Sequence, residues 1–279
     1  PSYLTCQATV AGDQTNAGTT DNVITGCAIY HGDEDITASL TALTRQNGTL
    51  TVAPLRIGIV PTDRSVEYDG NGKWAASTVT YVNGGSAGET LTFYDFGASG
   101  SDHLFYYALN TGDTLTVSMP QCGPDKGEYE FTPGCSVSGA EGNYILAAAI
   151  GKVTITPAEV TVTTGSASKA YDGYELTKAD GAEITGLKGY DTATVTATGS
   201  ITNVGSAANT YAIAWGSSTS SANYTVTENL GTLTVTTNST PITITLKPKS
   251  KVYDGTALYP DDLDFDYDGL PNDDLWIML

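Results

Sequence analysis

An acidic run near residue 265 has the residue types and spacing of a calcium-binding loop. Alternating aspartates end at Gly269, and Ca²⁺ prefers oxygen ligands that wrap it before a sharp glycine turn. A bidentate glutamate is expected further on, but Leu275 stands at that position. The calcium interpretation therefore needs a replacement ligand from the following acids. The ligand set it predicts is Asp264, Asp266, Asp268 and Asp273.

The same run also fits a strand. Leu263, Phe265 and Tyr267 alternate with the carboxylates, and a strand turns alternate side chains to opposite faces. The apolar side chains would then point inward and the carboxylates into water. The sequence leaves both interpretations open, and Ca²⁺ is the one cofactor it suggests.

Four cysteines fall into two local pairs, Cys6 with Cys27 and Cys122 with Cys135. An even number of cysteines in local pairs predicts disulfides and an oxidising compartment, although four buried thiols would give the same count. The first pair flanks one turn on two strands, with the two cysteines roughly opposite each other, so a bridge requires a Cα separation below about 7 Å. The second pair would close a loop and hold an excursion of the chain rigid.

Aromatic residues concentrate in the segment 94–142, around the second cysteine pair. A rigid excursion rich in aromatic side chains could stack on sugars or contact a protein, and it could equally fill an enlarged core. We expect a ligand surface here, made by Tyr94, Phe96, Phe105, Tyr106, Tyr107, Tyr129 and Phe131.

Sequence signatures of enzymes are missing. The chain has no nucleophile elbow, no H-E-x-x-H, no phosphate-binding loop and no strand-anchored dinucleotide fingerprint. Its two histidines, His31 and His103, are far apart in the chain. We predict no catalytic activity and no catalytic residues.

Internal repetition organises the chain. A Tyr-Asp-Gly core recurs at 68–70, 171–173 and 253–255, and a closing strand recurs at 48–52, 151–155 and 231–235. The two markers alternate, as they must if each repeat opens with one and closes with the other. Because Asp and Gly favour turns, the recurring core is expected to serve the fold, with its tyrosine packed over the core edge rather than exposed for stacking.

Finer matches join the ends to the middle of the chain. Asn22 parallels Asn209 and Gly269 parallels Gly186, each within a longer similar stretch. The expected domains are the back half of a repeat, an enlarged repeat with the cysteine excursion, a complete repeat, and the front half of another. Their bounds are 1–54, 55–157, 158–240 and 241–279.

Each repeat has the pattern of β-structure. Val160 and Val162 alternate with threonines, as do Ile242 and Ile244, which places apolar side chains on one face of a strand. Six or seven such strands in a repeat predict an all-β fold of tandem immunoglobulin-like β-sandwiches. The alternative is a β-grasp-like sheet with a short helix near 173–182.

These motifs resemble the YDG-type (MBG-like) tandem repeats of large bacterial cell-surface proteins. The resemblance is closest in 158–240 and extends into the segment that follows, while 55–157 is longer and lacks a clean middle motif. It implies an exported, multi-repeat, adhesin-like protein and no reaction.

Composition agrees with an extracellular protein. Lys and Arg total 12 against 31 Asp and Glu, a net charge of -19, which repels nucleic acid and anionic lipid. No apolar run approaches the length of a membrane helix. We expect a secreted or surface-anchored stalk or adhesin whose partners are host or matrix glycans and proteins, neighbouring repeats, or copies of itself.

Two other functions remain open from the sequence. One is a carbohydrate-binding accessory module of a secreted enzyme, which would expose the aromatic residues of 94–142. The other is a subunit of a head-to-tail extracellular filament, because the front half at the C-terminal side and the back half at the N-terminal side nearly tile one repeat. A segment cut from a longer array of repeats would look the same.

Overall fold

The computed structural model describes residues 3–81, 93–99, 102–259 and 265–271. These residues form short strands in several small sheets and two 3₁₀ turns, with no α-helix among them, so the protein is all-β as predicted. In the described residues no helix is long and apolar enough to cross a membrane. Contacts divide the chain into two compact units, Pro1–Val66 with Gly72–Ile155, and Glu67–Asn71 with Thr156–Leu279.

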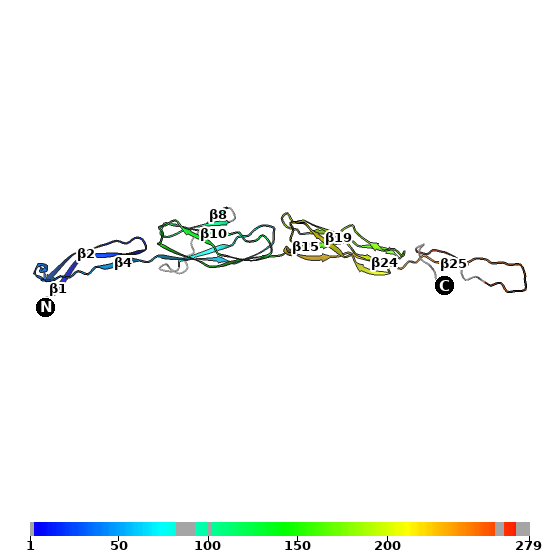
Figure 1. The fold of residues 1–279 in the computed structure, drawn as a ribbon, viewed down its shortest axis with the longest axis horizontal. Coiled ribbons are helices and arrows are strands. Elements are labelled where there is room, and N and C mark those ends of the chain that lie inside the picture. The colour runs from blue at the N-terminus through cyan, green and yellow to red at the C-terminus, as the bar shows by residue number, and fades with distance from the viewer. Residues whose placement is uncertain (1–2, 82–92, 100–101, 260–264, 272–279) are drawn as a thin grey trace. The chain divides into compact units, whose positions relative to one another are not determined.

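The first unit begins with a four-stranded sheet (Figure 1) in which no side chain is fully buried. Ile57 is the first fully buried side chain along the described chain, and every residue of the first strand is exposed. Strands 1 and 4 both pair with the second strand, and one 3₁₀ turn lies between strands 3 and 4. The elements are β1 (Leu4–Ala11), β2 (Gly18–His31), β3 (Glu34–Asp35), η1 (Thr37–Ser39) and β4 (Gly48–Val52).

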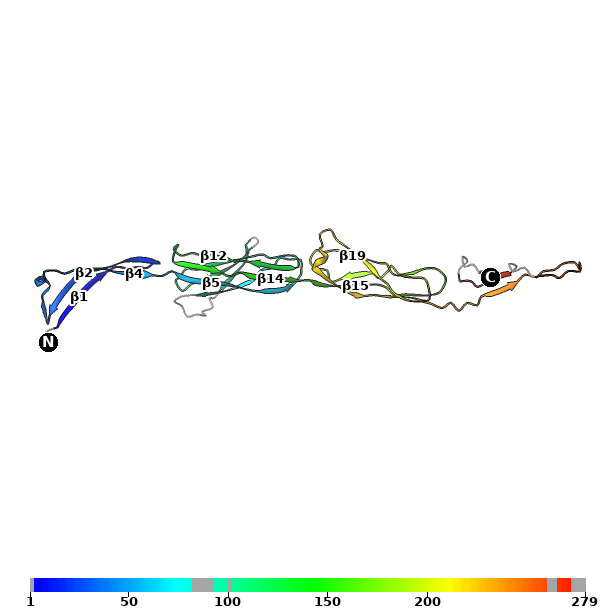
Figure 2. The ribbon, with the colours of Figure 1, turned by 60° about the horizontal axis from the view of Figure 1, so that its bottom comes forward.

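The enlarged repeat, apart from residues 67–71 and 156–157, forms the rest of the first unit (Figure 2), and it buries a core of apolar side chains. Its strands are β5 (Leu55–Thr62), β6 (Arg64–Glu67), β7 (Ala76–Tyr81), β8 (Phe93–Ser99), β9 (Asp102–Ala108), β10 (Thr114–Pro120), β11 (Gly127–Phe131), β12 (Gly134–Val137), β13 (Tyr144–Ala148) and β14 (Gly151–Thr156). They form the sheets β12-β10-β9-β8, β11-β14-β6 and β13-β5-β7. Alternate residues of β10, namely Leu115, Val117 and Met119, are fully buried, as the period of two requires.

The second unit contains the complete repeat 158–240. Its elements are β15 (Ala158–Thr163), β16 (Ala167–Ala170), β17 (Leu176–Thr177), β18 (Glu183–Thr185), β19 (Ala193–Ala197), β20 (Ser200–Ile201), β21 (Gly205–Ala208), β22 (Tyr211–Trp215), η2 (Ser221–Asn223), β23 (Tyr224–Asn229) and β24 (Thr232–Thr236). The main sheets are β18-β15-β23 and β16-β24-β21, and two strand pairs, β17-β20 and β19-β22, complete it. Val160, Val162, Leu233 and Val235 meet in its core.

The helix of the β-grasp alternative is absent. Where that alternative expects a helix near 173–182, the chain forms the short strand β17, which pairs with β20. The same unit ends with one further hairpin, β25 (Thr243–Leu246) with β26 (Phe265–Asp268).

Residues that the sequence aligns occupy the same strand registers. Gly18 pairs with Val52 between β2 and β4, as Gly205 pairs with Val235 between β21 and β24. In the hairpins, Ile244 opposite Tyr267 repeats Val162 opposite Ile184.

The glycines that follow these hairpins share a conformation. Gly186 and Gly269 both have positive φ, +96° and +83°, which glycine adopts readily. A Cβ at either position would also meet a backbone oxygen, that of Glu159 or Pro241, at less than 3 Å. The repeated glycines are therefore required by the local backbone.

Candidate functional site

The recurring Tyr-Asp-Gly core is a turn held by its aspartate. In all three copies the aspartate Oδ1 accepts a hydrogen bond from the backbone N–H two residues later, at 2.9–3.0 Å. The glycine between them has φ of +84°, +80° or +77°, a left-handed conformation that other residues adopt only with strain. This is an Asx turn, and it explains why Asp and Gly recur together.

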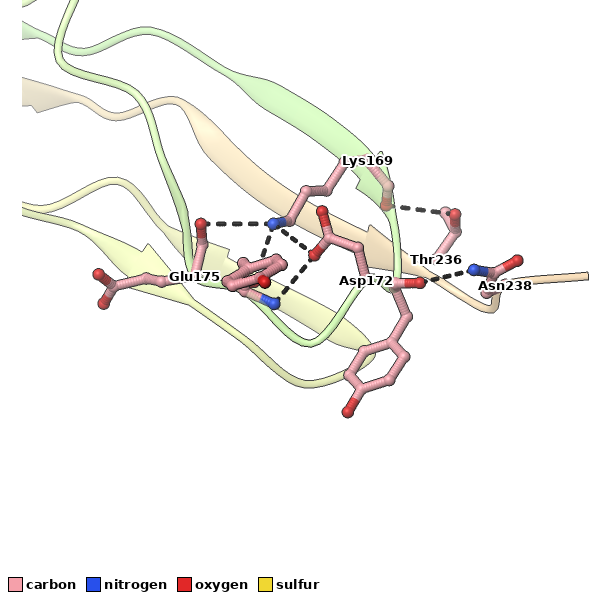
Figure 3. A network of polar contacts seen from close by, with 7 residues as sticks. Lys169, Asp172, Glu175, Thr236 and Asn238 are labelled. Carbon is pink, nitrogen blue, oxygen red and sulfur yellow. Dashed lines mark hydrogen bonds and ion pairs between the residues drawn. The ribbon is translucent and has the colours of Figure 1, made fainter. Parts of the chain in front are cut away.

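In two of the three turns, a lysine two residues before the tyrosine stabilises the turn by hydrogen bonds. In Figure 3 the Nζ of Lys169 lies 2.7 Å from Asp172 Oδ1 and donates to the carbonyl oxygens of Tyr174 and Glu175, at 2.8 and 3.3 Å. The ammonium group has three N–H donors, so these contacts use all of them. The hydrogen bond from Lys169 lowers the pKa of Asp172, helped by the backbone N–H of Tyr174.

The turn at 253–255 repeats this network. The Nζ of Lys251 lies 2.9 Å from Asp254 Oδ1, 2.6 Å from Thr256 Oγ1 and 3.1 Å from the carbonyl oxygen of Ala257. This lysine hydrogen bond and the donors of Thr256 lower the pKa of Asp254 to about 2. The two networks are complete and internal, so they bind the turn to itself rather than offering donors to a ligand.

The turn at 68–70 has Val66 in place of the lysine and is held through its tyrosine instead. Tyr68 is 5 % exposed, and its hydroxyl donates to Asp191 Oδ2 at 2.8 Å. Its ring meets Tyr224 edge-on with 5.5 Å between centroids. Glu67 forms an ion pair with Lys188 at 2.9 Å. These contacts explain why Glu67–Asn71 belongs to the second unit.

Asp191 joins two tyrosine hydroxyls. Tyr224 also donates to Asp191 Oδ2, at 2.6 Å, and its hydroxyl oxygen accepts the backbone N–H of Lys188. Burial raises the pKa of Tyr224, and the hydrogen bond to Asp191 raises it further. The stacked ring of Trp215, 5.5 Å away, covers one face of Tyr224. The cluster keeps the Tyr224 phenol protonated and holds residues 67–71 against the loop 188–191.

The three motif tyrosines are buried to different degrees. Tyr171 is half-buried; its backbone N–H donates to the Thr236 carbonyl, and its own carbonyl accepts from Asn238 Nδ2 (Figure 3). Tyr253 is 93 % exposed. Packing of the tyrosine at the core edge is confirmed for Tyr68, partly for Tyr171, and does not hold for Tyr253.

The predicted ligand surface is wrong for three of its seven residues. Phe105, Tyr107 and Phe131 are buried in the core, and the Tyr107 hydroxyl contacts Ser77 Oγ at 2.9 Å. Tyr106 and Tyr129 are half-buried. Tyr94 and Phe96 belong to β8, but their side chains lie outside the described residues. Alternation in β9 places Phe105 and Tyr107 on one face, and that face is covered.

The predicted disulfides are not present in this structure, which has four free thiols. Cys6 and Cys27 nevertheless lie close, with their Sγ atoms 3.3 Å apart. They are staggered rather than opposite, because Cys6 pairs with Ile29 and Cys27 with Ala8. A register shift between Thr9 and Val10 contributes to this stagger.

The second cysteine pair belongs to two different pairings. Cys135 lies in β12 opposite Val117, whereas Cys122 forms an isolated bridge with Lys73. Burial raises the pKa of both thiols, which disfavours the thiolate that would react.

The calcium ligands are only partly described. Asp264 and Asp273 lie outside the described residues. Asp266 and Asp268 belong to strand β26; the first forms an ion pair with Lys247 at 3.3 Å and the second accepts the N–H of Gly269. In the described part of the chain no three acidic, histidine or cysteine side chains are grouped to hold a metal. Phe265–Asp268 do form a strand, but Tyr267 is 46 % exposed, so the inward face that the strand interpretation expected is not formed there.

A surface hollow in the first unit is lined by polar side chains that already bind one another. Asn143 accepts the N–H of Ala17 and donates to Asn16 Oδ1, at 2.7 and 2.9 Å. The Tyr144 hydroxyl contacts both Asp113 and Thr111. These groups position loops and leave little polar capacity for a ligand.

Sequence reasoning missed the roles of Asp191 and Tyr224. The repeat alignment did contain a signal, since it matched the acid after Gly186-Leu187 with one after Gly269-Leu270. It could not show that two hydroxyls converge on that acid. Comparison with family models, curated proteins and solved structures finds no match to this chain.

Proposed function

We propose that this chain is a non-catalytic repeat segment of an exported bacterial surface protein, serving as stalk or adhesin architecture. The observation that carries the proposal is that the recurring residues serve the fold. Each Asp-Gly turn satisfies itself, and the Lys169 and Lys251 networks close on their own turns. The contacts described for the three motifs are all made to other parts of this chain, as a spacer module requires.

Tandem arrangement has its own support in the turn at 68–70. That turn closes against residues 188–191 and 224, which belong to the repeat 158–240. Residues 67–71 therefore belong to the second compact unit, although in the sequence they lie in the repeat 55–157.

The finer fold we propose is an immunoglobulin-like β-sandwich in each complete repeat. In 158–240 the two main sheets β18-β15-β23 and β16-β24-β21 each bury one face, Val160 and Val162 in one, Leu233 and Val235 in the other. Two apolar sheet faces of this kind are expected to pack on each other. The resemblance to YDG-type repeats and the acidic composition agree with an extracellular location.

A carbohydrate-binding accessory module is the weaker candidate. Such a module would present aromatic faces to sugars, and Phe105, Tyr107 and Phe131 are buried instead. Their burial favours an enlarged core and a spacer role for 55–157.

Force spectroscopy of the whole chain tests the stalk proposal. We expect separate unfolding events for 55–157 and 158–240. At about 3.4 Å per extended residue these segments reach roughly 350 Å and roughly 280 Å, and each length gain is that value less the folded end-to-end distance. Asn209→Ala should lower the force of the second event only, because Asn209 is buried in that repeat. A chain that extends without force-resisting events would contradict the proposal.

A binding experiment separates stalk from adhesin. The whole chain is tested against mucin, matrix proteins and a panel of glycans. Saturable binding would place an adhesive surface in this segment, and resistance to force without binding would make it a spacer.

A further inference from the structure

The complete repeat shows what neighbours its first strand needs. β15 pairs antiparallel with β18 on one side and parallel with β23 on the other. The next strand of the same half, β16, pairs parallel with β24. Both partners β23 and β24 come from the end of the repeat, so the back half covers the front half.

The hairpin β25–β26 has the same strand pairing as β15 with β18, but among the described residues no strand pairs with it as β23 pairs with β15. β25 pairs with β26 in the register of β15 with β18, and in the described residues it has no second neighbour. The aligned side chains differ sharply in exposure. Val160 and Val162 are 0 % exposed, whereas Ile242 and Ile244 are 51 % and 54 % exposed.

Residues 41–52 align with the covering strands β23 and β24. β4 aligns with β24 and pairs with β2 as β24 pairs with β21, but among the described residues it has no partner on its other side. Residues 41–46 align with β23 and follow η1 as β23 follows η2. They form no strand, and Leu43, aligned with the half-buried Val226, is 41 % exposed.

We propose that the front half at 241–255 is a strand-acceptor site and that its occupant is the segment 41–52 of a second copy of this chain. The interface is the one that the repeat 158–240 already contains between its own halves, with β15 against β23 and β16 against β24. It rests on the proposed function, since it assigns the partner through which such repeats would continue. Successive copies would then join head to tail.

The registers of the complete repeat fix the register of the site. Val160 pairs with Val226, so Ile242 should lie beside Leu43 of the second copy. Lys169 pairs with Val235, so Lys251 should lie beside Val52. Parallel pairing would satisfy backbone groups on both edges, and the exposed faces of Ile242 and Ile244 would lose water.

The test measures the mass of the intact chain by light scattering as its concentration is raised. The wild type is expected to grow into a series of oligomers. Ile244→Asp should destroy the acceptor and Leu43→Asp the donor, so each variant alone should remain a monomer. An equimolar mixture of the two should form dimers and nothing larger, because one intact acceptor meets one intact donor.

Two controls keep the outcome specific. Ile150→Asp changes an apolar residue that is 70 % exposed outside both edges, and it should assemble as the wild type does. At a concentration where every variant is monomeric, their circular dichroism and melting curves should match, because Leu43 and Ile244 lie outside the buried cores.

A wild type that stays monomeric at every concentration would overturn the proposal, as would a mixture of variants that forms no dimer. The occupant of the acceptor would then be another part of the polypeptide or a different protein. Neither result would change the outcome of the force and binding experiments, so these test the stalk proposal independently of the acceptor site.

Discussion

The side-chain Nδ2 of Asn209 donates a hydrogen bond to the carbonyl oxygen of Gly165 at 2.9 Å, joining positions 44 residues apart. The same amide nitrogen donates to the carbonyl oxygen of Lys178 at 2.8 Å. The backbone of Asn209 is tied in too, because its carbonyl accepts from Thr164 Oγ1. Asn209 is fully buried, so it acts as an internal clamp of the repeat 158–240.

Replacing Asn209 should lower the stability of the repeat 158–240. Asn209→Ala removes two hydrogen bonds and leaves two carbonyl oxygens without that donor, so we expect a loss of about 2–4 kcal/mol in the free energy of unfolding. Urea unfolding of the whole chain, followed by the fluorescence of Trp215 in a background with Trp74→Phe and Trp276→Phe, would measure it. Asn22→Ala is the matched control: Asn22 is the aligned residue but only half-buried, and its replacement should cost much less. Equal losses at the two positions would contradict the clamp.

The lysine networks predict the titration of the motif aspartates. The pKa of Asp254 is about 2, chiefly because Lys251 donates to it. In Lys251→Met this pKa should rise toward the ordinary aspartate value, about 3.9. Carbon-13 NMR titration of the carboxyl groups would follow the change, with Lys169→Met as the parallel test on Asp172. An Asp254 pKa that does not move would show that Thr256 alone holds the carboxylate.

These depressed pKa values also set a pH window for stability. A carboxylate whose pKa is lowered by folding stabilises the protein above its unfolded value, about pH 4, and loses that contribution as the pH falls toward 2. Acid unfolding of the wild type should therefore begin below about pH 4. Lys169→Met should flatten this part of the curve, since Asp172 then titrates more nearly alike in both states.

The repeat alignment predicted backbone structure better than it predicted surfaces. Gly186 and Gly269 could be matched because one backbone conformation demands glycine at both. Strand alternation places Phe105 and Tyr107 on one face, but the sequence does not tell which face another sheet covers. That depends on packing between segments distant in sequence.

Local strand register was the second feature that could not be predicted from the sequence. The sequence placed Cys6 roughly opposite Cys27, and the register shift between Thr9 and Val10 is not visible in residue types. A shift of one residue changes which side chains face each other, so cross-strand contacts cannot be read from spacing alone.

The staggered thiols of Cys6 and Cys27 should still react with each other first. Their Sγ atoms are 3.3 Å apart, whereas Cys122 is buried and 6 % exposed. A thiol oxidant such as diamide should remove these two thiols first, as one intramolecular bond, found by mass spectrometry of peptides. The hydrogen bond with Cys27 raises the pKa of Cys6, so the reaction should speed up as the pH rises above neutral. First formation of a Cys122–Cys135 bridge would contradict the expectation, and Cys6→Ser is the control that should block the bond.

The shared carboxylate of Asp191 predicts sensitivity to alkali. Burial and the hydrogen bond to Asp191 raise the pKa of Tyr224 above its ordinary value, so folding stabilises the protonated phenol. That contribution is complete below the unfolded pKa, about 10, and is lost as the pH rises through the folded value. Tyr224→Phe should lower the free energy of unfolding by about 1–2 kcal/mol at pH 8, because it loses the hydrogen bonds to Asp191 and from Lys188.

The difference in free energy of unfolding between the wild type and Tyr224→Phe should then shrink as the pH rises above about 10. The wild type loses the stabilisation by its protonated phenol at high pH, and the variant lacks it at every pH. Urea unfolding at pH 8 and near pH 11 would measure both. Tyr190→Phe, at a side chain that is fully exposed, should leave the pH dependence unchanged. A deficit that is the same at both pH values would mean that Tyr224 contributes packing alone and that its proton plays no part in holding the turn 67–71 to the loop 188–191.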